Sequence, residues 1–361
     1  MSKLDLTVSG PDLTEVLMNI SSVSGTEETL ADQVEAALSA YPHLKVFRHG
    51  NTVVARTDLG RDERIVIAGH LDTVPLNDNL PARRADGLIH GLGACDMKGG
   101  LAVGLRLAAT LDEPNRDITY VFYDCEEIES ERNGLFKLTK SNPELLEGVF
   151  AVVMEPSNAV VEAGCQGTLR IEVTTRGERA HSARSWMGRN AIHASGEVLA
   201  RLAAYEPRWV PIDGLEYREG LNAVGISGGV AGNVVPDLCT VAINYRFAPN
   251  RSEAEAEAHL REVFEGYDVV VTDSAPGGLP GLERPAAAAF LQVVGGAPQP
   301  KFGWTDVARF TLLGVPAVNY GPGDPLYAHK QDEFVPEAEI AQCEQRLRQW
   351  LIPSPPHRPG R

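Results

Sequence analysis

Cysteine is scarce in this sequence, and no two cysteines have the spacing of a metal or redox motif. The five cysteines, at positions 95, 125, 165, 239 and 343, are odd in number and form no CxxC pair. This usage favours free thiols in a reducing cytoplasm over a disulfide framework. We therefore expect a cytoplasmic protein in which Cys95 and Cys125 are small buried packing residues rather than ligands.

Long apolar runs and an excess of positive charge are also missing. The best candidate for a membrane span, LAVGLRLAATL, is interrupted by Arg106. The first residues, MSKLDLTVSGPDLTEVL, lack a basic stretch followed by an apolar one, so we expect no signal peptide. With 33 Lys and Arg against 49 Asp and Glu, the formal net charge is −16. Phosphate backbones and anionic lipids repel such a chain, so we predict neither a nucleic-acid nor a membrane partner.

The apolar runs that are present alternate with helical patterns. At 361 residues the chain exceeds a single core, so two domains are expected. Helix-forming segments separate four predicted strands, at 64–69, 118–123, 148–154 and 315–321. This alternation predicts an α/β/α catalytic domain with a mixed, twisted sheet and helices on both faces. Near the start, Ser24 and Glu27 have the spacing of a capping box that opens a helix.

The middle of the chain has a different pattern. Residues 169–177 alternate apolar and polar side chains, as a half-solvated antiparallel strand does. Two helical segments (190–205 and 252–267) and two further strands (240–247 and 268–274) follow. We therefore predict an inserted α+β domain at 169–279 with an antiparallel sheet. The catalytic domain is then discontinuous and comprises 1–168 and 280–361.

Three predicted strands end in side chains that bind metals. His70 and Asp72 follow the first strand, Glu126 and Glu127 follow the second, and Glu155 follows the third. Because ligands of open α/β sheets bind beyond the carboxyl ends of strands, these side chains are placed to converge. Asp96 in GLGACDMKGG and His329 in LYAHKQDE would complete the set. Salt-bridged strand ends would explain either the HxD or the EE pair alone, whereas the whole constellation is more specific.

Histidines and carboxylates suit zinc or a similar divalent ion. Two histidines and three carboxylates over-supply one zinc ion, whereas two ions that share Asp96 and a hydroxide bring the cluster near neutrality. Asp72 lies two residues after His70 and can accept its second imidazole N–H. Neighbouring residues of extended chain point apart, so one of Glu126 and Glu127 should bind metal and the other should face the water as a general base. The spacing does not decide between the two.

These motifs resemble a known family, the co-catalytic dizinc amidohydrolases. The family includes aminoacylases, glutamate-releasing carboxypeptidases, acetylornithine deacetylases and succinyl-diaminopimelate desuccinylases. The resemblance covers nearly the whole chain, through GHLDTVP, GLGACDMKGG, DCEEIES, EPS, RAHSA, GGVAGNVVPD, INYRFAP, GWTDVARF and GPGDPLYAHKQDE. Within the family, EAGCQGTLR, RAHSARSW, YREGLNAV and KFGWTDVARF are most similar to the actinobacterial desuccinylases.

The resemblance implies two Zn²⁺ ions per chain, for which Co²⁺ can substitute, and it implies which residues bind each ion. His70 and Glu155 would bind one ion and Glu127 and His329 the other, with Asp96 bridging. Glu126 would then be the general base, and Asp72 would orient His70.

The resemblance also implies that 169–279 is a lid that pairs with its twin in a homodimer. His181 would reach the partner subunit's active site to stabilise the oxyanion. The alternative for His181 is a surface histidine at a strand end.

Asn233, Arg246 and Arg309 resemble substrate contacts, since a guanidinium suits the carboxylates of a succinylated diamino acid. The alternative for both arginines is a structural salt bridge. Gln166 departs from the family pattern, because many desuccinylases have an arginine pair in this stretch and Gln166 stands where a carboxylate-binding arginine is expected. Arg184 or Arg189 could compensate, and the departure bears on the identity of the acyl group.

The expected reaction is hydrolysis of N-succinyl-LL-2,6-diaminopimelate to succinate and LL-2,6-diaminopimelate. An acetylornithine deacetylase, a metallo-dipeptidase or an aminoacylase is the alternative within the family. A non-catalytic metal-binding scaffold is the alternative outside it. The presence of the base and of every ligand argues against the scaffold.

Overall fold

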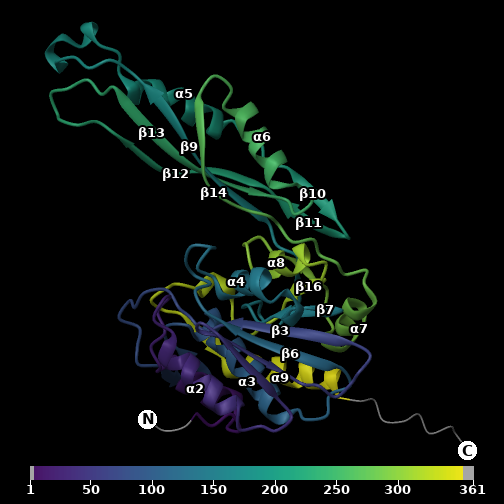
Figure 1. The fold of residues 1–361 in the computed structure, drawn as a ribbon. Helices are drawn as coiled ribbons and strands as arrows, with labels where there is room; N and C mark the ends of the chain where they lie inside the picture. The colour runs from purple at the N-terminus through teal and green to yellow at the C-terminus, as the bar shows by residue number, and fades with distance from the viewer. Residues whose placement is uncertain (1–3, 353–361) are drawn as a thin grey trace, which may run out of the picture. The chain divides into compact units, whose positions relative to one another are not determined.

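The chain folds into two compact units (Figure 1). The computed structural model describes residues 4–352. The first unit comprises Met1–Ala163, Pro280–Gln299 and Thr305–Arg361, and the second comprises Gly164–Leu279 and Pro300–Trp304. Among residues 4–352, no helix combines the length and the apolar character needed to cross a membrane. Whether the second unit acts as a lid or a dimerisation domain stays a prediction.

A mixed eight-stranded sheet forms the centre of the first unit, in the order β1-β2-β6-β3-β7-β16-β8-β15. Its strands are β1 (Lys45–His49), β2 (Thr52–Arg56), β3 (Arg64–His70), β6 (Asp117–Tyr123), β7 (Phe150–Val153), β8 (Glu162–Ala163), β15 (Gln299–Pro300) and β16 (Ala317–Asn319). The central strands β6, β3, β7 and β16 run parallel. They are almost entirely buried, as expected for parallel strands that helices cover on both faces.

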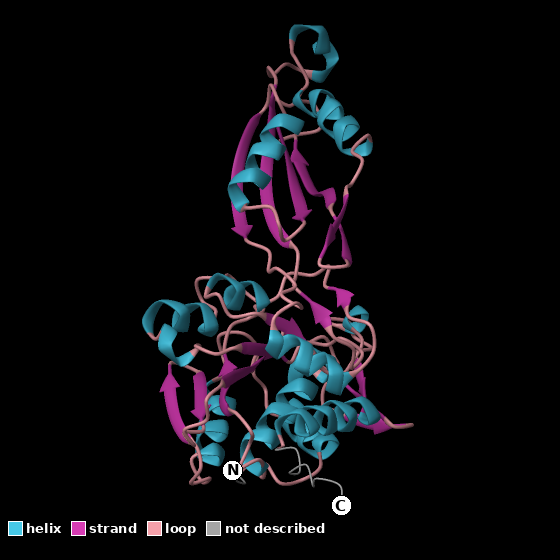
Figure 2. Ribbon diagram, turned by 90° about the vertical axis from the view of Figure 1, so that its right-hand side faces the viewer, coloured by secondary structure: helices cyan, strands magenta, loops and turns pink. Residues whose placement is uncertain are grey.

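Helices flank this sheet on two sides, so the predicted α/β/α arrangement is confirmed (Figures 1 and 2). The helices are α1 (Gly10–Met18), α2 (Glu28–Leu38), α3 (Gly99–Thr110), α4 (Gly134–Ser141), α7 (Pro285–Val294), α8 (Val307–Leu312) and α9 (Glu337–Leu351). Short helical turns are η1 (Ala94–Lys98), η2 (Pro143–Leu145) and η4 (Pro325–Tyr327). A small sheet of β4 (Arg83–Ala85), β5 (Leu88–His90) and β17 (Phe334–Pro336) joins the segment after His329 to the segment before η1.

The second unit is built on a four-stranded antiparallel sheet in the order β12-β13-β9-β14. Its elements are β9 (Gly167–Arg176), η3 (Ser182–Met187), α5 (Ala191–Ala203), β10 (Trp209–Ile212), β11 (Leu215–Arg218), β12 (Gly220–Gly228), β13 (Leu238–Phe247), α6 (Glu253–Val263) and β14 (Asp268–Ala275). In β9, buried and exposed residues alternate, as the sequence predicts. Ile171 pairs with Ile243, and both belong to a core that also includes Val198 of α5 and Leu260 of α6.

Two local features differ from the expectation. The capping box of Ser24 and Glu27 is wrong, because α2 begins at Glu28 and Glu27 makes no side-chain capping bond. Both side chains turn instead toward other loops, where they accept or donate hydrogen bonds described below. The glycine-containing segment LNAVGISGG was not expected to be a strand, yet most of it forms β12 because its backbone pairs with β13.

Candidate metal centre and active site

Adjacent parallel strands bring the predicted ligands to one edge of the central sheet. β3 lies between β6 and β7 and runs parallel to both, so the carboxyl ends of the three strands meet. His70 is the last residue of β3, and Glu126 and Glu127 follow the end of β6. Glu155 follows the end of β7 and is buried. The three strand ends therefore lie at one edge of the sheet, and the role of Glu155 there stays a prediction.

His70, Asp96 and Glu127 form the closest group of potential metal ligands at this edge. Each offers one ligand atom, and the three atoms lie within 4.8 Å of one another. The carboxylate of Asp96 faces two histidines: its Oδ1 is 3.0 Å from His70 Nε2 and its Oδ2 is 3.3 Å from His329 Nε2. His329 Nε2 is also 2.8 Å from Glu127 Oε1. A carboxylate with one oxygen toward each histidine fits a bridge between two divalent ions, and the N and O donors suit zinc.

The charges in this group compensate one another through protons on the histidines. Hydrogen bonds to Asp96 and Glu127 raise the pKa of His329 to about 11. Burial lowers the pKa of His70, but hydrogen bonds to Asp72 and Asp96 outweigh it and raise that pKa well above its usual value. Burial acts to raise the pKa of Asp96, and the two histidines reverse this and lower it. A metal ion held by the same atoms must displace these protons.

Glu126 and Glu127 differ in their surroundings. Burial raises the pKa of both carboxyl groups. Glu127 lies against His329, whereas the pKa of Glu126 is raised further by the charges of Glu155 and Asp306. A buried carboxyl group with a raised pKa suits the exchange of a proton with water at neutral pH. This surrounding is compatible with Glu127 as the ligand and Glu126 as the base, and both roles stay predictions.

Asp72 binds the Glu126–Glu127 turn more closely than it binds His70. His70 Nδ1 is 3.0 Å from the backbone oxygen of Asp72 and 3.5 Å from its Oδ1. The carboxylate instead accepts the backbone N–H of Glu126 (3.0 Å), the N–H of Glu127 (3.1 Å) and the hydroxyl of Ser24 (2.7 Å). Asp72 therefore fixes the backbone that carries both glutamates, in addition to lying beside the imidazole.

Arg309 and Arg246, the predicted substrate-binding arginines, have different surroundings. Arg309 is buried in the first unit, pairs with Asp306, donates to Ser130 Oγ (3.0 Å) and lies over the ring of Phe136. These contacts agree with the structural alternative, and its substrate role stays a prediction. Arg246 is half-buried on β13, and within residues 4–352 it has no ion-pair partner. Burial lowers the pKa of its guanidinium, so an anionic ligand there would be strongly favoured.

The remaining predicted contacts also belong to the second unit. His181 and Asn233 are exposed and lie on paired segments, since the N–H of Ser182 donates to the backbone oxygen of Asn233 (2.9 Å). Their relation to the metal ligands stays a prediction. Gln166 is buried, and its Nε2 donates to the backbone oxygen of Arg218 (2.6 Å). The side-chain amide of Gln166 is therefore used in a hydrogen bond within the second unit, which fits a structural role for this residue.

Both arginines proposed to compensate for Gln166 are exposed. Arg184 lies in η3, and the backbone of Arg189 pairs with that of Glu178. That either arginine replaces the carboxylate-binding arginine missing at Gln166 stays a prediction.

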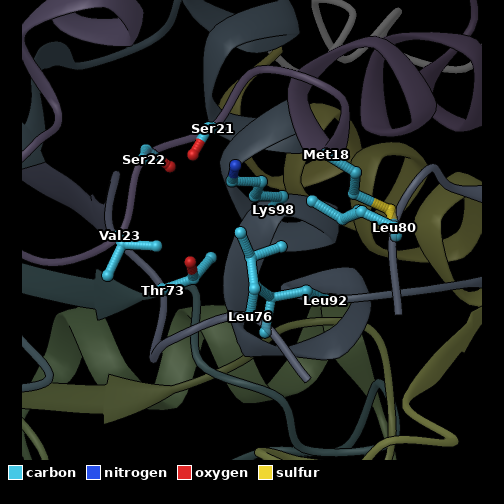
Figure 3. Close-up of a pocket in the computed structure, with 9 residues that line it drawn as sticks. All are labelled: Met18, Ser21, Ser22, Val23, Thr73, Leu76, Leu80, Leu92 and Lys98. Atoms are coloured by element: carbon cyan, nitrogen blue, oxygen red, sulfur yellow. The ribbon is translucent and has the colours of Figure 1, made fainter. Parts of the chain in front are cut away.

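The sequence analysis missed three buried charged residues around the ligand loops. Glu27 and Glu333 accept hydrogen bonds from the backbone of these loops. Lys98, in the CDMKGG motif, donates to the backbone oxygens of Leu17 (3.0 Å) and Ile20 (2.8 Å), and burial lowers its pKa to about 7. Figure 3 shows Lys98 in a largely apolar pocket at this position. Lys98 and Glu333 lie inside the motifs CDMKGG and AHKQDE, so they could have been singled out as residues close to the predicted ligands. Glu27 could not, because its SxxE spacing from Ser24 was interpreted as a capping box.

Comparison with known families matches most of the chain. The model of Peptidase family M20/M25/M40 matches residues 66–352. A relative from Mycobacterium tuberculosis, which carries the provisional name succinyl-diaminopimelate desuccinylase DapE, is 54% identical over 96% of this chain and 99% of its own. A Corynebacterium glutamicum succinyl-diaminopimelate desuccinylase is 47% identical over 94% of this chain and 95% of its own.

Solved structures share the fold at lower sequence identity. A Bacillus subtilis dinuclear metal-binding peptidase of the M20 family superposes with a TM-score of 0.71 at 17% identity. The match covers 94% of this chain and 96% of that one. The large mixed sheet and the separate antiparallel sheet are therefore a known arrangement.

Proposed function

The chain belongs to peptidase family M20/M25/M40, and from this membership we propose that it hydrolyses N-succinyl-LL-2,6-diaminopimelate. The products are succinate and LL-2,6-diaminopimelate, a precursor of lysine and of cell-wall peptide. The observation that carries the proposal is the high identity to two desuccinylases over nearly the full length of all three chains. The arrangement of Asp96 between two histidines supports the metal-dependent chemistry. We expect the reaction to take place in the cytoplasm.

Two divalent ions, Zn²⁺ with Co²⁺ as a substitute, would be held by residues at the sheet edge. The residues are His70, Asp96, Glu127, Glu155 and His329. The N and O donor set of the three closest residues fits such ions. When bound, the ions would supply Lewis-acid activation of water and of the amide carbonyl.

Glu126 is the general base in this proposal. Its carboxyl group takes a proton from the attacking water and later delivers one to the departing amine. Burial raises the pKa of the Glu126 carboxyl group, which makes it a better proton acceptor than an exposed carboxylate and supports its role as the base. Asp72 keeps the Glu126 backbone in place through the N–H that it accepts.

Residues of the second unit recognise the substrate and stabilise the oxyanion. Arg246 is the strongest candidate for a substrate carboxylate, because its half-buried guanidinium is unpaired within the described chain. Asn233 of the second unit and Arg309 of the first unit would add contacts to the substrate. His181 would stabilise the developing negative charge on the carbonyl oxygen of the partner subunit's substrate.

A homodimer through the second unit completes the proposal. β12 is an edge strand, and its exposed residues include Val224 and Ile226, which are 65% and 55% exposed. An exposed apolar edge strand readily pairs with another chain, which supports pairing with a second copy. Trp186 and Met187, in the η3 segment after His181, are also largely exposed.

The first test compares N-succinyl-LL-2,6-diaminopimelate with N-acetylornithine, using zinc-loaded protein and a chelated control. We expect rapid, metal-dependent release of succinate. Cleavage of the acetyl compound alone would assign the deacetylase activity instead. In parallel, E126Q should lose turnover and keep its zinc content, and loss of zinc would contradict the assignment of the two glutamates. Two zinc ions per chain without activity on any acylated amino acid would support a non-catalytic scaffold.

A further inference from the structure

We propose that Glu27 and Glu333 are positioning residues that hold the two backbone turns on which the metal ligands and the general base are mounted. Each is a buried carboxylate outside the ligand set. Glu333 holds the turn of Asp96, and Glu27 holds the turn of Glu126 and Glu127. The inference rests on the proposed function for the roles of these three residues, while the contacts that support it are independent of the substrate.

Both carboxylate oxygens of Glu333 accept hydrogen bonds from the backbone turn that ends at Asp96. Glu333 is 1% exposed. Its Oε1 accepts the backbone N–H of Cys95 (2.9 Å) and of Asp96 (3.1 Å), and its Oε2 accepts the N–H of Gly93 (3.1 Å). Because Glu333 follows His329 by one short turn, its carboxylate ties the segment of one predicted ligand to the segment of another.

Glu27 holds the other turn in the same way. It is fully buried at the start of α2. Its Oε1 accepts the N–H of Gly25 (2.7 Å) and of Cys125 (3.1 Å), and the Cys125 thiol lies 3.4 Å away. Asp72 accepts the next two N–H groups, those of Glu126 and Glu127. Three successive amides of this turn are therefore held by buried carboxylates.

The two turns share one design. In each, a cysteine precedes an acidic residue, and a distant glutamate accepts the N–H of that cysteine: Glu333 for Cys95 and Glu27 for Cys125. Cys125 has a φ of +56°, a left-handed conformation that its surroundings must enforce. Charge-assisted bonds to buried amides are strong and directional, which suits them to this task. A displacement of about 1 Å at a catalytic group can cost about 100-fold in rate, so the hold on these turns matters for chemistry.

A third metal site is the competing explanation for Glu27. Glu27, Asp124 and Cys125 also offer three ligand atoms within 4.8 Å of one another. However, Glu27 Oε1 already accepts two backbone N–H groups, and Asp124 Oδ1 accepts the hydroxyl of Thr52 (2.6 Å). Because one oxygen of each carboxylate is already hydrogen-bonded within the protein, the positioning role accounts for this geometry without a cation.

Substitutions at Glu27 distinguish the effect of its acceptor oxygen, which holds the turn, from the effect of its negative charge. E27Q keeps an oxygen where Oε1 accepts both N–H groups, whereas E27D keeps the charge and is one methylene too short to reach them. We expect E27D and E27A to lower kcat by about 10–100-fold with little change in KM, and E27Q to stay within about threefold of the parent. E28A, at the exposed neighbouring position, is the control that should behave as the parent.

Glu333 is tested through metal affinity. E333A removes all three bonds, and E333Q places an amide N–H against the N–H of Gly93. We expect zinc affinity, measured by competition with a chromogenic chelator, to fall by about 10–100-fold in E333A and by less in E333Q. D332A, at an exposed neighbouring position, is the control.

The outcomes are decisive. If E27D retains full kcat while E27Q loses it, Glu27 acts through its charge and the proposal fails. If the parent binds a third zinc ion that E27A does not bind, Glu27 is a metal ligand and the proposal also fails. Parent-like zinc affinity in folded E333A refutes the role of Glu333. Should the parent bind zinc but not cleave the succinyl substrate, the proposed function fails, while the affinity measurements still test the positioning of Asp96.

Discussion

Replacement of Asp72 by alanine should destabilise the metal-free protein by an amount that can be worked out from its hydrogen bonds. The carboxylate is fully buried and accepts the N–H groups of Glu126 and Glu127 and the hydroxyl of Ser24. The Ser24 hydroxyl also lies 3.2 Å from the backbone oxygen of Thr73, so it keeps a partner in D72A. The two amides have no such alternative and become unpaired.

Each buried N–H without a partner costs about 1–3 kcal/mol, so D72A should lose about 2–6 kcal/mol of unfolding free energy. A central value of about 4 kcal/mol corresponds to a fall in Tm of roughly 8–16 °C for a unit of this size. D72N keeps one acceptor oxygen and leaves one amide facing an NH₂ group, so we expect about half of this loss. S24A keeps both amide bonds and should cost less than about 1 kcal/mol.

The assay is thermal unfolding followed by circular dichroism in the presence of a chelator, which removes the contribution of bound metal to stability. The expected order of Tm is parent, S24A, D72N and D72A, from highest to lowest. If D72A unfolds within about 1 °C of S24A, the carboxylate does not hold the turn and the reasoning is refuted. Turnover of zinc-loaded D72N should also fall by about 10–100-fold, because the turn carries the general base.

Five further outcomes test other parts of the structure. G100A places a Cβ against the backbone carbonyl oxygen of Met154 and should abolish folding, whereas the Cβ of G196A meets no other atom and should leave Tm unchanged or raised; equal Tm values would contradict the packing. Because the pKa of His329 is raised to about 11, zinc binding at pH 7 should release protons, seen as a buffer-dependent enthalpy in calorimetry. The pKa of His329 is higher in the folded, metal-free chain (about 11) than its usual value of 6.5, so its protonation stabilises the fold. This stabilisation is complete below pH 6.5 and is lost as the pH rises toward 11. R246A should raise KM for the succinyl substrate at least tenfold, and an unchanged KM would remove it from the site. If the protein forms the proposed homodimer, V224K should shift it to monomer in light scattering, and a dimer that V224K leaves intact would place the interface elsewhere.

The strand ends could be predicted from the sequence because their evidence is local. The runs of β3 and β6 are long, apolar and followed at once by His70 and by Glu126 with Glu127. Parallel pairing of neighbouring strands then brings these ends together without further information.

Glu27 and Glu333 could not be placed because their partners are distant in sequence. A local SxxE pattern suggested a capping box, whereas the carboxylate of Glu27 bonds to Cys125 on another loop. Glu333 likewise bonds to the turn of Asp96, which lies across the inserted unit in the sequence. β12 was missed for a related reason, since its glycines and exposed residues resemble a loop until β13 supplies the pairing.

The position of β16 in the central sheet has a consequence for biosynthesis. β16 (Ala317–Asn319) lies between β7 and β8, although the long stretch Gly164–Leu279 of the second unit precedes it in the chain. During translation, that stretch emerges with a core of its own before β16 exists. The unit that contains the N-terminus is therefore the last to be completed, and β7 has an unpaired edge until residue 319 has left the ribosome. The nascent chain should accordingly be most prone to aggregation, and most dependent on chaperones, while the second unit is being made.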